Sequence, residues 1–525
     1  MLWNITICFF IFVKLHEAAN ILVVIPYAVT SHYKMQRPIG LELARRGHNV
    51  TVITPYLELD CPPTYHQVKV SEKKIWTVID KRWEDLSNVV KVTSVDFHSN
   101  ILWTGGLALT KTTLKNPDVQ KFLTNNQTFD AVISEQFYQE ATYIFAHKYK
   151  APLILITTFG SSIKHNVATR NPLQLATLVN EFVEIKSPNF FKGRLWNLLF
   201  SSYEYIWWRF WFLKKQEELV EKYVPNLPQP SPSLYELQQN VSLYLMNTHF
   251  SFDPPAAYLP NFIEIGGIHL NEEVEKLPQD IQRILDEASN GVVYVNFGSN
   301  IKSSELPIEK KNALINVFKS LNQTVLWKWE DDNFGNQTAN IKTRKWLPQN
   351  EILAHQNVRI FISHGGLMGT IEAIFHGVPI IGIPLFGDQY NNLLQVENAG
   401  SGIILEYHNL NENNMRSLIN HVLSNEKYKN NARDLSIRFR DRPIKALDAA
   451  MYWIEYVIRH QGAHFMKNPA LKLNWFAYNM FDVYLFILCV FIISVYVSYR
   501  CLKFLVYFRI NTRFDRKLCG KVKFQ

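Results

Sequence analysis

The chain has 525 residues, of which 47% are hydrophobic and 19% are charged. It is too long for one ordinary domain and too apolar for a disordered protein, so two packed domains are expected. The formal net charge is +9. However, the segment from Arg500 to the end holds eight basic residues and one acidic residue, which leaves the rest nearly neutral. A nucleic-acid-binding protein would need a basic face on its folded body, and this composition does not supply one.

The N-terminus has the form of a secretory signal. Residues 5–13 are a short apolar run that is followed by Ala18 and Ala19. Such a run is too short to span a bilayer, and small residues after it are typical of a cleavage site. We therefore expect residues 1–19 to be a signal peptide, with a buried N-terminal strand as the alternative.

The C-terminus predicts a membrane anchor. Residues 483–499 carry no charge, and a helix of that length covers about 26 Å, near the lower limit for crossing a bilayer. The basic tail, residues 500–525, favours a cytosolic position, so a single-pass type I topology with a lumenal body is expected over a buried core helix. Lys521 and Lys523 resemble the dilysine signal of proteins kept in the endoplasmic reticulum membrane.

Cysteines and glycosylation motifs fit a lumenal body. Cys61 is the only cysteine of the body, so no intrachain disulfide is expected there, and no Cys/His spacing predicts a metal site. A further glycosylation motif, at Asn49, opens an apolar strand and is expected to be hidden. The glycosylation candidates are Asn126, Asn240, Asn322 and Asn336.

The body alternates short apolar runs with amphipathic stretches, which predicts an α/β fold with parallel sheets. One series of strands occupies residues 20–270 and a second occupies residues 291–450. The acidic segment 271–290 between them is interpreted as a linker, and residues 451–482 as helices that pack back and approach the membrane. The expected strands are residues 20–26, 49–54, 131–134, 152–157 and 242–247, then 291–299, 324–329, 359–363, 378–384 and 402–405. Two doubly wound, Rossmann-like domains facing a cleft are therefore expected, with ligands at the carboxyl ends of the strands.

A glycine-rich turn follows the strand at residues 359–363. His364 begins it, Gly366 and Gly369 let a ligand approach the backbone, and Glu372 is expected in the first turn of the next helix. Backbone N–H groups at a helix start attract phosphate, and a carboxylate suits sugar hydroxyls. A plain glycine-rich turn remains the alternative. The absence of a GxGxxG pattern in the sequence disfavours a nicotinamide site.

Two flanking motifs favour a nucleotide sugar. Trp346 can stack on a flat base, and Gln349 beside it can bond the polar edge of that base. Asp388 and Gln389 end a later apolar strand and suit sugar hydroxyls.

The run FISHGGLMGTIE that ends at Glu372, followed after six residues by PIIGIPLFGDQ that ends at Gln389, resembles the signature of the UDP-glycosyltransferase family. The resemblance covers nearly the whole chain. It implies the GT-B fold and an inverting, metal-free transfer from a UDP-sugar, a co-substrate rather than a cofactor, to a small lipophilic acceptor. It also implies that Trp346 and Gln349 hold uracil and that Glu372 holds the ribose. Asp388 and Gln389 would hold the transferred sugar, and the residues implied to hold the diphosphate are Ser299, His364, Gly366 and Gly369.

The catalytic base is expected from the first domain. His32 follows the strand at residues 20–26, precedes a helix expected at residues 34–46, and matches the base of the family. A base histidine usually needs a carboxylate partner. The family places an aspartate where this chain has Glu135, so Glu135 is favoured over Asp130, which precedes the strand.

Two departures from the family pattern concern chemistry. Glu135 replaces the commoner aspartate, and Met368 stands where many members carry asparagine beside the phosphates. Together they resemble the invertebrate, particularly insect, branch, which implies UDP-glucose rather than UDP-glucuronate as the donor.

Residues 194–215 hold four of the 13 tryptophans. This segment could rest on the membrane surface, wall an acceptor pocket or form an ordinary buried helix. An active hexosyltransferase is favoured over a non-catalytic lipophile-binding protein on the same scaffold, and a hydrolase would lack a G-x-S-x-G motif. The acceptor and the oligomeric state, a homo-oligomer included, are left open.

Overall fold

The computed structural model describes residues 18–81, 86–187, 189–271, 273–299, 301–332, 334 and 338–521. The predicted signal peptide through residue 17, the Asn336 motif and Lys523 lie outside the described residues. The described residues up to Lys467 form one compact unit, and those from Asn468 onward form a second.

The first sheet has seven parallel strands in the order β3-β2-β1-β4-β5-β6-β7. These strands are β1 Asn20–Val24, β2 Asn49–Thr54, β3 Tyr65–Lys69, β4 Ala131–Glu135, β5 Leu153–Thr157, β6 Leu243–Met246 and β7 Phe262–Glu264. The order reverses between β1 and β4, which makes their carboxyl ends the switch point at which such sheets bind ligands.

The second sheet repeats this topology with six parallel strands, in the order β10-β9-β8-β11-β12-β13. They are β8 Val292–Asn296, β9 Thr324–Lys328, β10 Ile341–Arg344, β11 Val358–Ser363, β12 Ile380–Gly382 and β13 Gly402–Ile404. Its switch point lies between β8 and β11. The two doubly wound domains predicted from the sequence are therefore present.

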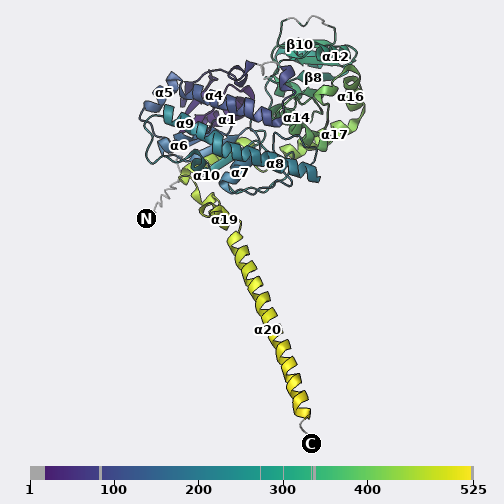
Figure 1. Ribbon diagram of the computed structural model, residues 1–525. Helices are drawn as coiled ribbons and strands as arrows, with labels where there is room; N and C mark the ends of the chain where they lie inside the picture. Colours follow the sequence, from purple (N-terminus) through teal and green to yellow (C-terminus); the bar gives the residue numbers. More distant parts are fainter. Residues whose placement is uncertain are drawn as a thin grey trace, which may run out of the picture. The chain divides into compact units, whose positions relative to one another are not determined.

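Helices cover both faces of both sheets (Figure 1). In the first domain they are α1 Thr30–Arg45, α2 Leu86–Val89, α3 Ser94–Asp96, η3 Phe97–Trp103, α4 Thr104–Leu114, α5 Pro117–Thr124, α6 Ile144–Tyr149, α7 Ile163–Thr169, α8 Phe191–Trp207, η5 Trp208–Phe212, α9 Leu213–Tyr223 and α10 Leu234–Gln239. The later ones are α11 Gln279–Asp286, α12 Ile308–Lys319, α13 Gln349–Leu353, α14 Leu367–His376, α15 Gln389–Asn398, α16 Glu412–Ser424, α17 Glu426–Arg440, α18 Ala446–Arg459, α19 Trp475–Tyr478 and α20 Phe481–Lys521. Short helical turns are η1 Ile75–Thr77, η4 Glu140–Tyr143, η6 Ser303–Glu305, η7 Tyr407–Asn409, η8 His464–Met466 and η9 Pro469–Lys472.

The predicted linker, residues 271–290, and the segment that follows the second domain both contribute buried side chains to a hydrophobic core. α11 lies within the predicted linker and buries Ile281 and Leu285 in the core of the second domain. α18 instead returns to the first sheet, where Ala450 and Ile454 join its core. That return begins at Ala446, a few residues before the expected boundary.

The tryptophan-rich segment has two different faces. α8, η5 and α9 form one helical run in which Trp208 and Phe212 are fully buried. The opposite face exposes large apolar side chains, so an ordinary buried helix accounts for only half of the pattern. The exposed side chains are Leu195, Trp196, Leu198, Leu199, Ile206, Trp207 and Phe210.

α20 contains the predicted span and is longer than expected. Within it, residues 481–512 have the length and apolarity to cross a membrane, with a mean hydropathy of 2.3 over the most apolar window. The helix continues past Tyr499 into the basic tail because no proline or glycine interrupts it before Gly520.

The glycosylation candidates that the structure describes, Asn126, Asn240 and Asn322, are all exposed. The expectation for Asn49 is wrong. Asn49 is exposed at the first position of β2, and its amide donates to Asn20 Oδ1 at 3.1 Å.

Candidate functional site

The first half of the site lies at the switch point of the first sheet. α1 begins at Thr30, earlier than predicted, so His32 lies in the first turn of α1, directly after β1. Glu135 is the last residue of the neighbouring strand β4 and is fully buried. His32 Nδ1 lies 2.5 Å from Glu135 Oε1, which accepts its hydrogen bond. This pairing leaves Nε2 as the ring nitrogen that can exchange a proton with a ligand.

The surroundings of His32 hold the ring in place. Phe137 and Phe159 pack edge-on against it, with centroid distances of 4.6 and 5.7 Å, and Thr158 Oγ1 lies 3.3 Å from Nδ1. Asp130, the alternative partner, lies before β4 and accepts a hydrogen bond from the backbone N–H of Asn20 at 2.8 Å. The structure thus brings His32 together with Glu135 and not with Asp130.

The second half of the site lies at the switch point of the second sheet. β11 ends at Ser363, and α14 begins at Leu367 after a turn in which Gly365 has φ +87°. The His364 ring lies between two glycines, because a Cβ at Gly298 or at Gly366 would come within 2.7 Å of it. Burial, and then the charge of Lys328, lower the pKa of His364 to about 4. At neutral pH this ring is therefore uncharged and can donate one hydrogen bond to an anion.

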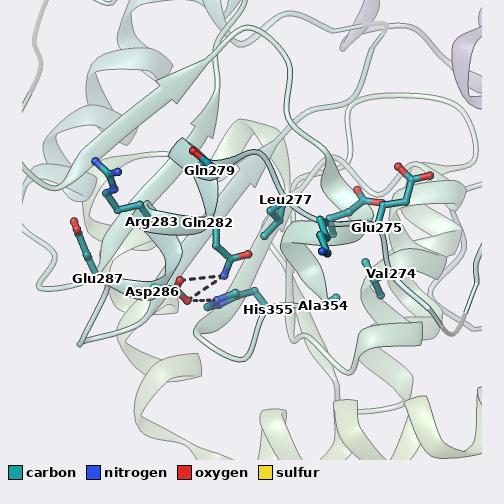
Figure 2. Close-up of a pocket in the computed structure, with 12 residues that line it drawn as sticks. Val274, Glu275, Leu277, Gln279, Gln282, Arg283, Asp286, Glu287, Ala354 and His355 are labelled. Carbon is teal, nitrogen blue, oxygen red and sulfur yellow. Dashed lines mark hydrogen bonds and ion pairs between the residues drawn. The ribbon is translucent and has the colours of Figure 1, made fainter.

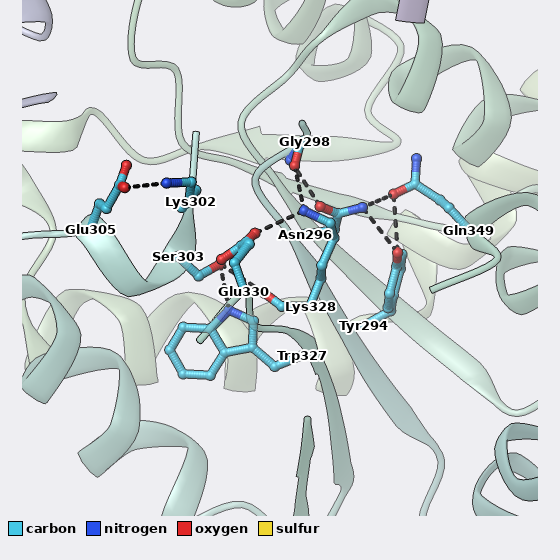
Figure 3. Close-up of polar contacts among 10 residues, drawn as sticks. All are labelled: Tyr294, Asn296, Gly298, Lys302, Ser303, Glu305, Trp327, Lys328, Glu330 and Gln349. Atoms are coloured by element: carbon cyan, nitrogen blue, oxygen red, sulfur yellow. Dashed lines mark hydrogen bonds and ion pairs between the residues drawn. The ribbon is translucent and has the colours of Figure 1, made fainter. Parts of the chain in front are cut away.

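Lys328 is a functional candidate that sequence reasoning missed. It ends β9, and its Nζ donates to the carbonyl oxygen of Gly298 and to Glu330, both at 2.8 Å (Figure 3). Its positive charge therefore lies close enough to the glycine-rich turn to act on His364. The available signal was a lysine at the end of a buried strand, where a charge needs a partner. Ser299, which follows Gly298 in the loop after β8, is exposed.

A chain of polar side chains connects β8 to α14. Asn296 Nδ2 donates to Gln349 Oε1 at 2.6 Å, and the hydroxyl of Tyr294 donates to the same oxygen at 3.2 Å (Figure 3). At its other end, Gln349 Nε2 donates to Glu372 Oε2. A Cβ at Gly369 would come 2.9 Å from that Nε2, so glycine makes room for the amide.

Glu372 is the sixth residue of α14 and so lies in its second turn, not in the first as expected. It is only 5% exposed. Burial, partly offset by the bond from Gln349 and by Lys34, raises the pKa of Glu372 to about 7. Trp346, by contrast, is 62% exposed, with Lys34 Nζ 5.9 Å from its ring centroid. Its indole face is open to a flat ligand.

Asp388 and Gln389 begin α15. Asn392 Nδ2 donates to Asp388 Oδ2 at 2.6 Å, and Gln389 Oε1 accepts the backbone N–H groups of Leu385 and Phe386. Burial is the main reason that the pKa of Asp388 is raised.

A cavity of about 150 Å³ joins the two halves of the site. His32, His364, Asp388 and Gln389 all line it, together with Gly366 and Met368, the second departure from the family pattern. The rest of its wall is mainly apolar and aromatic. That part includes Val29, Met35, Ile75, Trp76, Phe97, Ile101, Leu102, Phe137, Phe159, Phe182 and Phe386.

A larger open hollow, about 720 Å³ beside α11 and α13, is lined mostly by polar and charged residues (Figure 2). It contains none of the predicted site residues. We place the chemistry in the smaller cavity because the paired histidine and the side chains suited to sugar hydroxyls meet there.

Substituting Gly298 tests the position of His364. Gly298→Ala is expected to weaken UDP binding about tenfold or more, because the new methyl displaces the ring that would contact the diphosphate. Gly47→Ala is the matched control, since Gly47 has a similar φ of +93° but no atom within 4 Å of the place that a Cβ would occupy. Calorimetry with UDP measures both variants, and equal affinities would contradict the placement of His364.

Comparison with known proteins shows what the chain is similar to. Residues 20–515 match the family model described as UDP-glucoronosyl and UDP-glucosyl transferase. UDP-glucosyltransferase 2 of Dactylopius coccus is 35% identical over 500 residues, which cover 94% of each chain. UDP-glucuronosyltransferase 2B19 of Macaca fascicularis is 28% identical over 92% of this chain and 93% of its own. Among solved structures, the calicheamicin glycosyltransferase CalG4 shares the GT-B fold, with a TM-score of 0.58, 18% identity, and coverage of 84% of this chain and 99% of that one.

Proposed function

The chain belongs to the UDP-glucoronosyl and UDP-glucosyl transferase family and is a UDP-glycosyltransferase, and we propose that it transfers glucose from UDP-glucose to a hydroxyl group of a small lipophilic acceptor. The reaction would invert the anomeric carbon and give a β-glycoside and UDP. One observation carries this proposal: His32, paired with Glu135, shares a cavity with Asp388, Gln389 and His364.

In the proposed reaction His32 is the base. Its Nε2 removes the hydroxyl proton of the acceptor as the oxygen attacks the anomeric carbon, and Glu135 stabilises the resulting imidazolium. The bond to the UDP oxygen breaks on the opposite side. The charge of the leaving UDP is met by the start of α14, by His364 and by Lys328.

The nucleoside would lie beyond the diphosphate. Trp346 offers a ring face to uracil, with Gln349 at the edge of the base, and Glu372 accepts hydrogen bonds from the ribose. Gly366 and Gly369 leave room for the phosphates to approach the backbone, and Ser299 lines the diphosphate site. Asp388 and Gln389 hold the hexose.

The apolar wall supports a lipophilic acceptor, since thirteen apolar side chains line the cavity together with His32. The lining also supports a neutral sugar. No lysine or arginine lines the cavity among the described residues, and Asp388 would repel the carboxylate of glucuronate. The greater similarity to the relative named as a glucosyltransferase points the same way.

The test uses the full-length protein in microsomes with UDP-glucose, UDP-glucuronate, UDP-galactose or UDP-N-acetylglucosamine, and 1-naphthol as acceptor. We expect the glucoside to form fastest. UDP binding without any glycoside across a wider set of acceptors would favour the alternative, a non-catalytic lipophile-binding protein. Failure of the folded protein to bind UDP in calorimetry would refute the family site altogether.

We also propose that no metal or cofactor takes part in the transfer, because α14, His364 and Lys328 together supply the positive potential that the leaving UDP needs. The expected result is that EDTA, at about 5 mM and so in large excess over adventitious metal, leaves the rate of glycoside formation unchanged. A rate that EDTA abolishes and Mg²⁺ restores would contradict this proposal.

The proposed location is the endoplasmic reticulum membrane, with the body in the lumen. α20 supports the anchor, and the basic tail supports a cytosolic C-terminus. Lumenal exposure predicts glycosylation at Asn126, Asn240 or Asn322. Glycosylation is measured as a shift in electrophoretic mobility after enzymatic deglycosylation, and this shift should be lost when the modified asparagine is replaced by glutamine.

A further inference from the structure

Asn391 joins the two halves of the cleft. It is the third residue of α15 in the second domain, yet its side-chain amide contacts a loop of the first domain. Nδ2 lies 3.1 Å from the carbonyl oxygens of Asn180 and Glu181 and 3.0 Å from that of Val183. One amide group thus serves three carbonyl groups that converge on it.

The loop at residues 180–183 is also held from inside its own domain. Asn180 Nδ2 donates to Glu204 Oε2 at 2.7 Å, and the N–H of Asn180 donates to Asn197 Oδ1 at 2.9 Å. Glu204 is fully buried and paired with Lys164 Nζ at 2.8 Å. A satisfied buried network of this kind fixes the inner side of the loop, so its outer side depends on Asn391.

The loop carries part of the acceptor wall. Phe182 lines the cavity that holds His32. Its ring packs edge-on against His98, 4.5 Å between centroids, and lies 6.3 Å from Phe97, another wall residue. Movement of the loop would therefore change the shape of the acceptor pocket.

The other end of the connection is the proposed sugar site. Asp388 and Gln389 begin the same helix, so a single helical turn links them to Asn391. A hexose held by these two side chains would fix the start of α15 and with it the amide that the loop needs.

We propose that Asn391 is a positioning residue that couples binding of the donor sugar to the acceptor wall at residues 180–183. This inference rests on the proposed function, because it takes Asp388 and Gln389 as the sugar ligands. The donor would stabilise the wall through Asn391 before the acceptor enters, so that the pocket around His32 is better ordered when a sugar is bound.

The chemistry of the contact makes the prediction specific. Three carbonyl oxygens require a donor, and without one their partial charges are left unpaired in a half-buried place. Asn391→Ala removes the donor. Asn391→Asp keeps the size but presents oxygens to the carbonyl groups, so it should disrupt the contact more than alanine does.

Hydrogen exchange of the full-length protein in detergent, with and without UDP-glucose, tests the proposal without any acceptor. In the wild type we expect UDP-glucose to slow exchange in residues 361–372 and, about fivefold or more, in residues 178–186. In both Asn391 variants only residues 361–372 should remain protected. Asn398→Ala, exposed at the far end of the same helix, is the matched control and should behave as the wild type.

The outcomes separate the two levels of inference. Loss of protection at residues 178–186 in both variants, with residues 361–372 still protected, supports the role of Asn391. Two results would overturn that role. One is that UDP-glucose protects residues 178–186 equally in the variants and in the wild type. The other is that in the wild type UDP-glucose protects residues 361–372 but not residues 178–186. No protection at residues 361–372 in the wild type would instead defeat the proposed function.

Discussion

Replacing His32 by glutamine is expected to reduce glycoside formation about 10²–10⁴-fold, which is the usual contribution of a general base. UDP affinity should stay the same, because the residues proposed to hold the nucleotide lie in the other domain. The physical reason is that Nδ1 is already bonded to Glu135 at 2.5 Å, so Nε2 alone can accept the acceptor's proton. Initial rates with UDP-glucose and 1-naphthol, beside UDP calorimetry, provide the measurement.

Glu135→Gln should also lower the rate, by about 10² or more, since an amide cannot stabilise an imidazolium as a carboxylate does. Asp130→Asn is the matched control. It removes a carboxylate from the other end of β4, where Asp130 bonds the backbone of Asn20, and it should leave the rate unchanged. A His32→Gln protein with full activity would show that another group is the base.

The family resemblance implied the choice between these two carboxylates, and the geometry of parallel strands explains it. Parallel strands bring their carboxyl ends to one edge of a sheet. Glu135 ends β4 beside the end of β1, whereas Asp130 precedes β4 and lies at the opposite edge. The order of the two residues along β4 thus explains why the partner implied by the family resemblance, Glu135, is the one that reaches His32.

The interior strands were equally predictable, but only one of the four edge strands, β13, was predicted. β1, β4, β5 and β8 are buried along nearly their whole length and appear as apolar runs. β3, β7 and β10 were missed. Each forms an edge of its sheet and buries only one residue, so its sequence lacks both a continuous run and a clear alternation.

The hydrogen bonds that hold the donor-site residues in place could not be predicted from the sequence either. The motif identified His364, Gln349 and Glu372, but not the bonds that Asn296 and Tyr294 make to Gln349. These contacts join residues that are more than 50 positions apart. Lys328 was also missed, since its partner is the backbone carbonyl of Gly298, in the loop that follows the neighbouring strand β8.

Glu372→Gln is expected to stabilise the protein at alkaline pH while weakening UDP binding. The pKa of Glu372 is about 7 in the folded protein, above its ordinary value of 4.5, because the carboxyl group is buried. Between these two pH values the folded chain keeps a proton that the unfolded chain has released. The wild type therefore loses stability as pH rises from about 4.5 to 7, by up to about 3 kcal/mol, and no more above it.

The glutamine variant has no such proton to lose, and its oxygen can still accept the bond from Gln349. Its stability should match the wild type at pH 5 and exceed it at pH 8, as measured by thermal unfolding without ligand. UDP affinity at pH 8 should fall about tenfold or more, because the ribose loses a charged acceptor. A stability difference that is the same at both pH values would mean that Glu372 is ionised throughout.

Glu372→Gln is expected to raise stability but to lower UDP affinity, and these opposite changes make the experiment informative about function. A purely structural carboxylate in this position would be replaced by glutamine without any cost to nucleotide binding. A residue that binds the ribose must keep its carboxylate, although burial makes the ionised form destabilise the fold. Such a cost in stability is expected at a functional site. UDP should then bind more tightly as pH rises through about 7 in the wild type but not in the variant. If the two show the same pH dependence, Glu372 does not contact the ribose as a carboxylate.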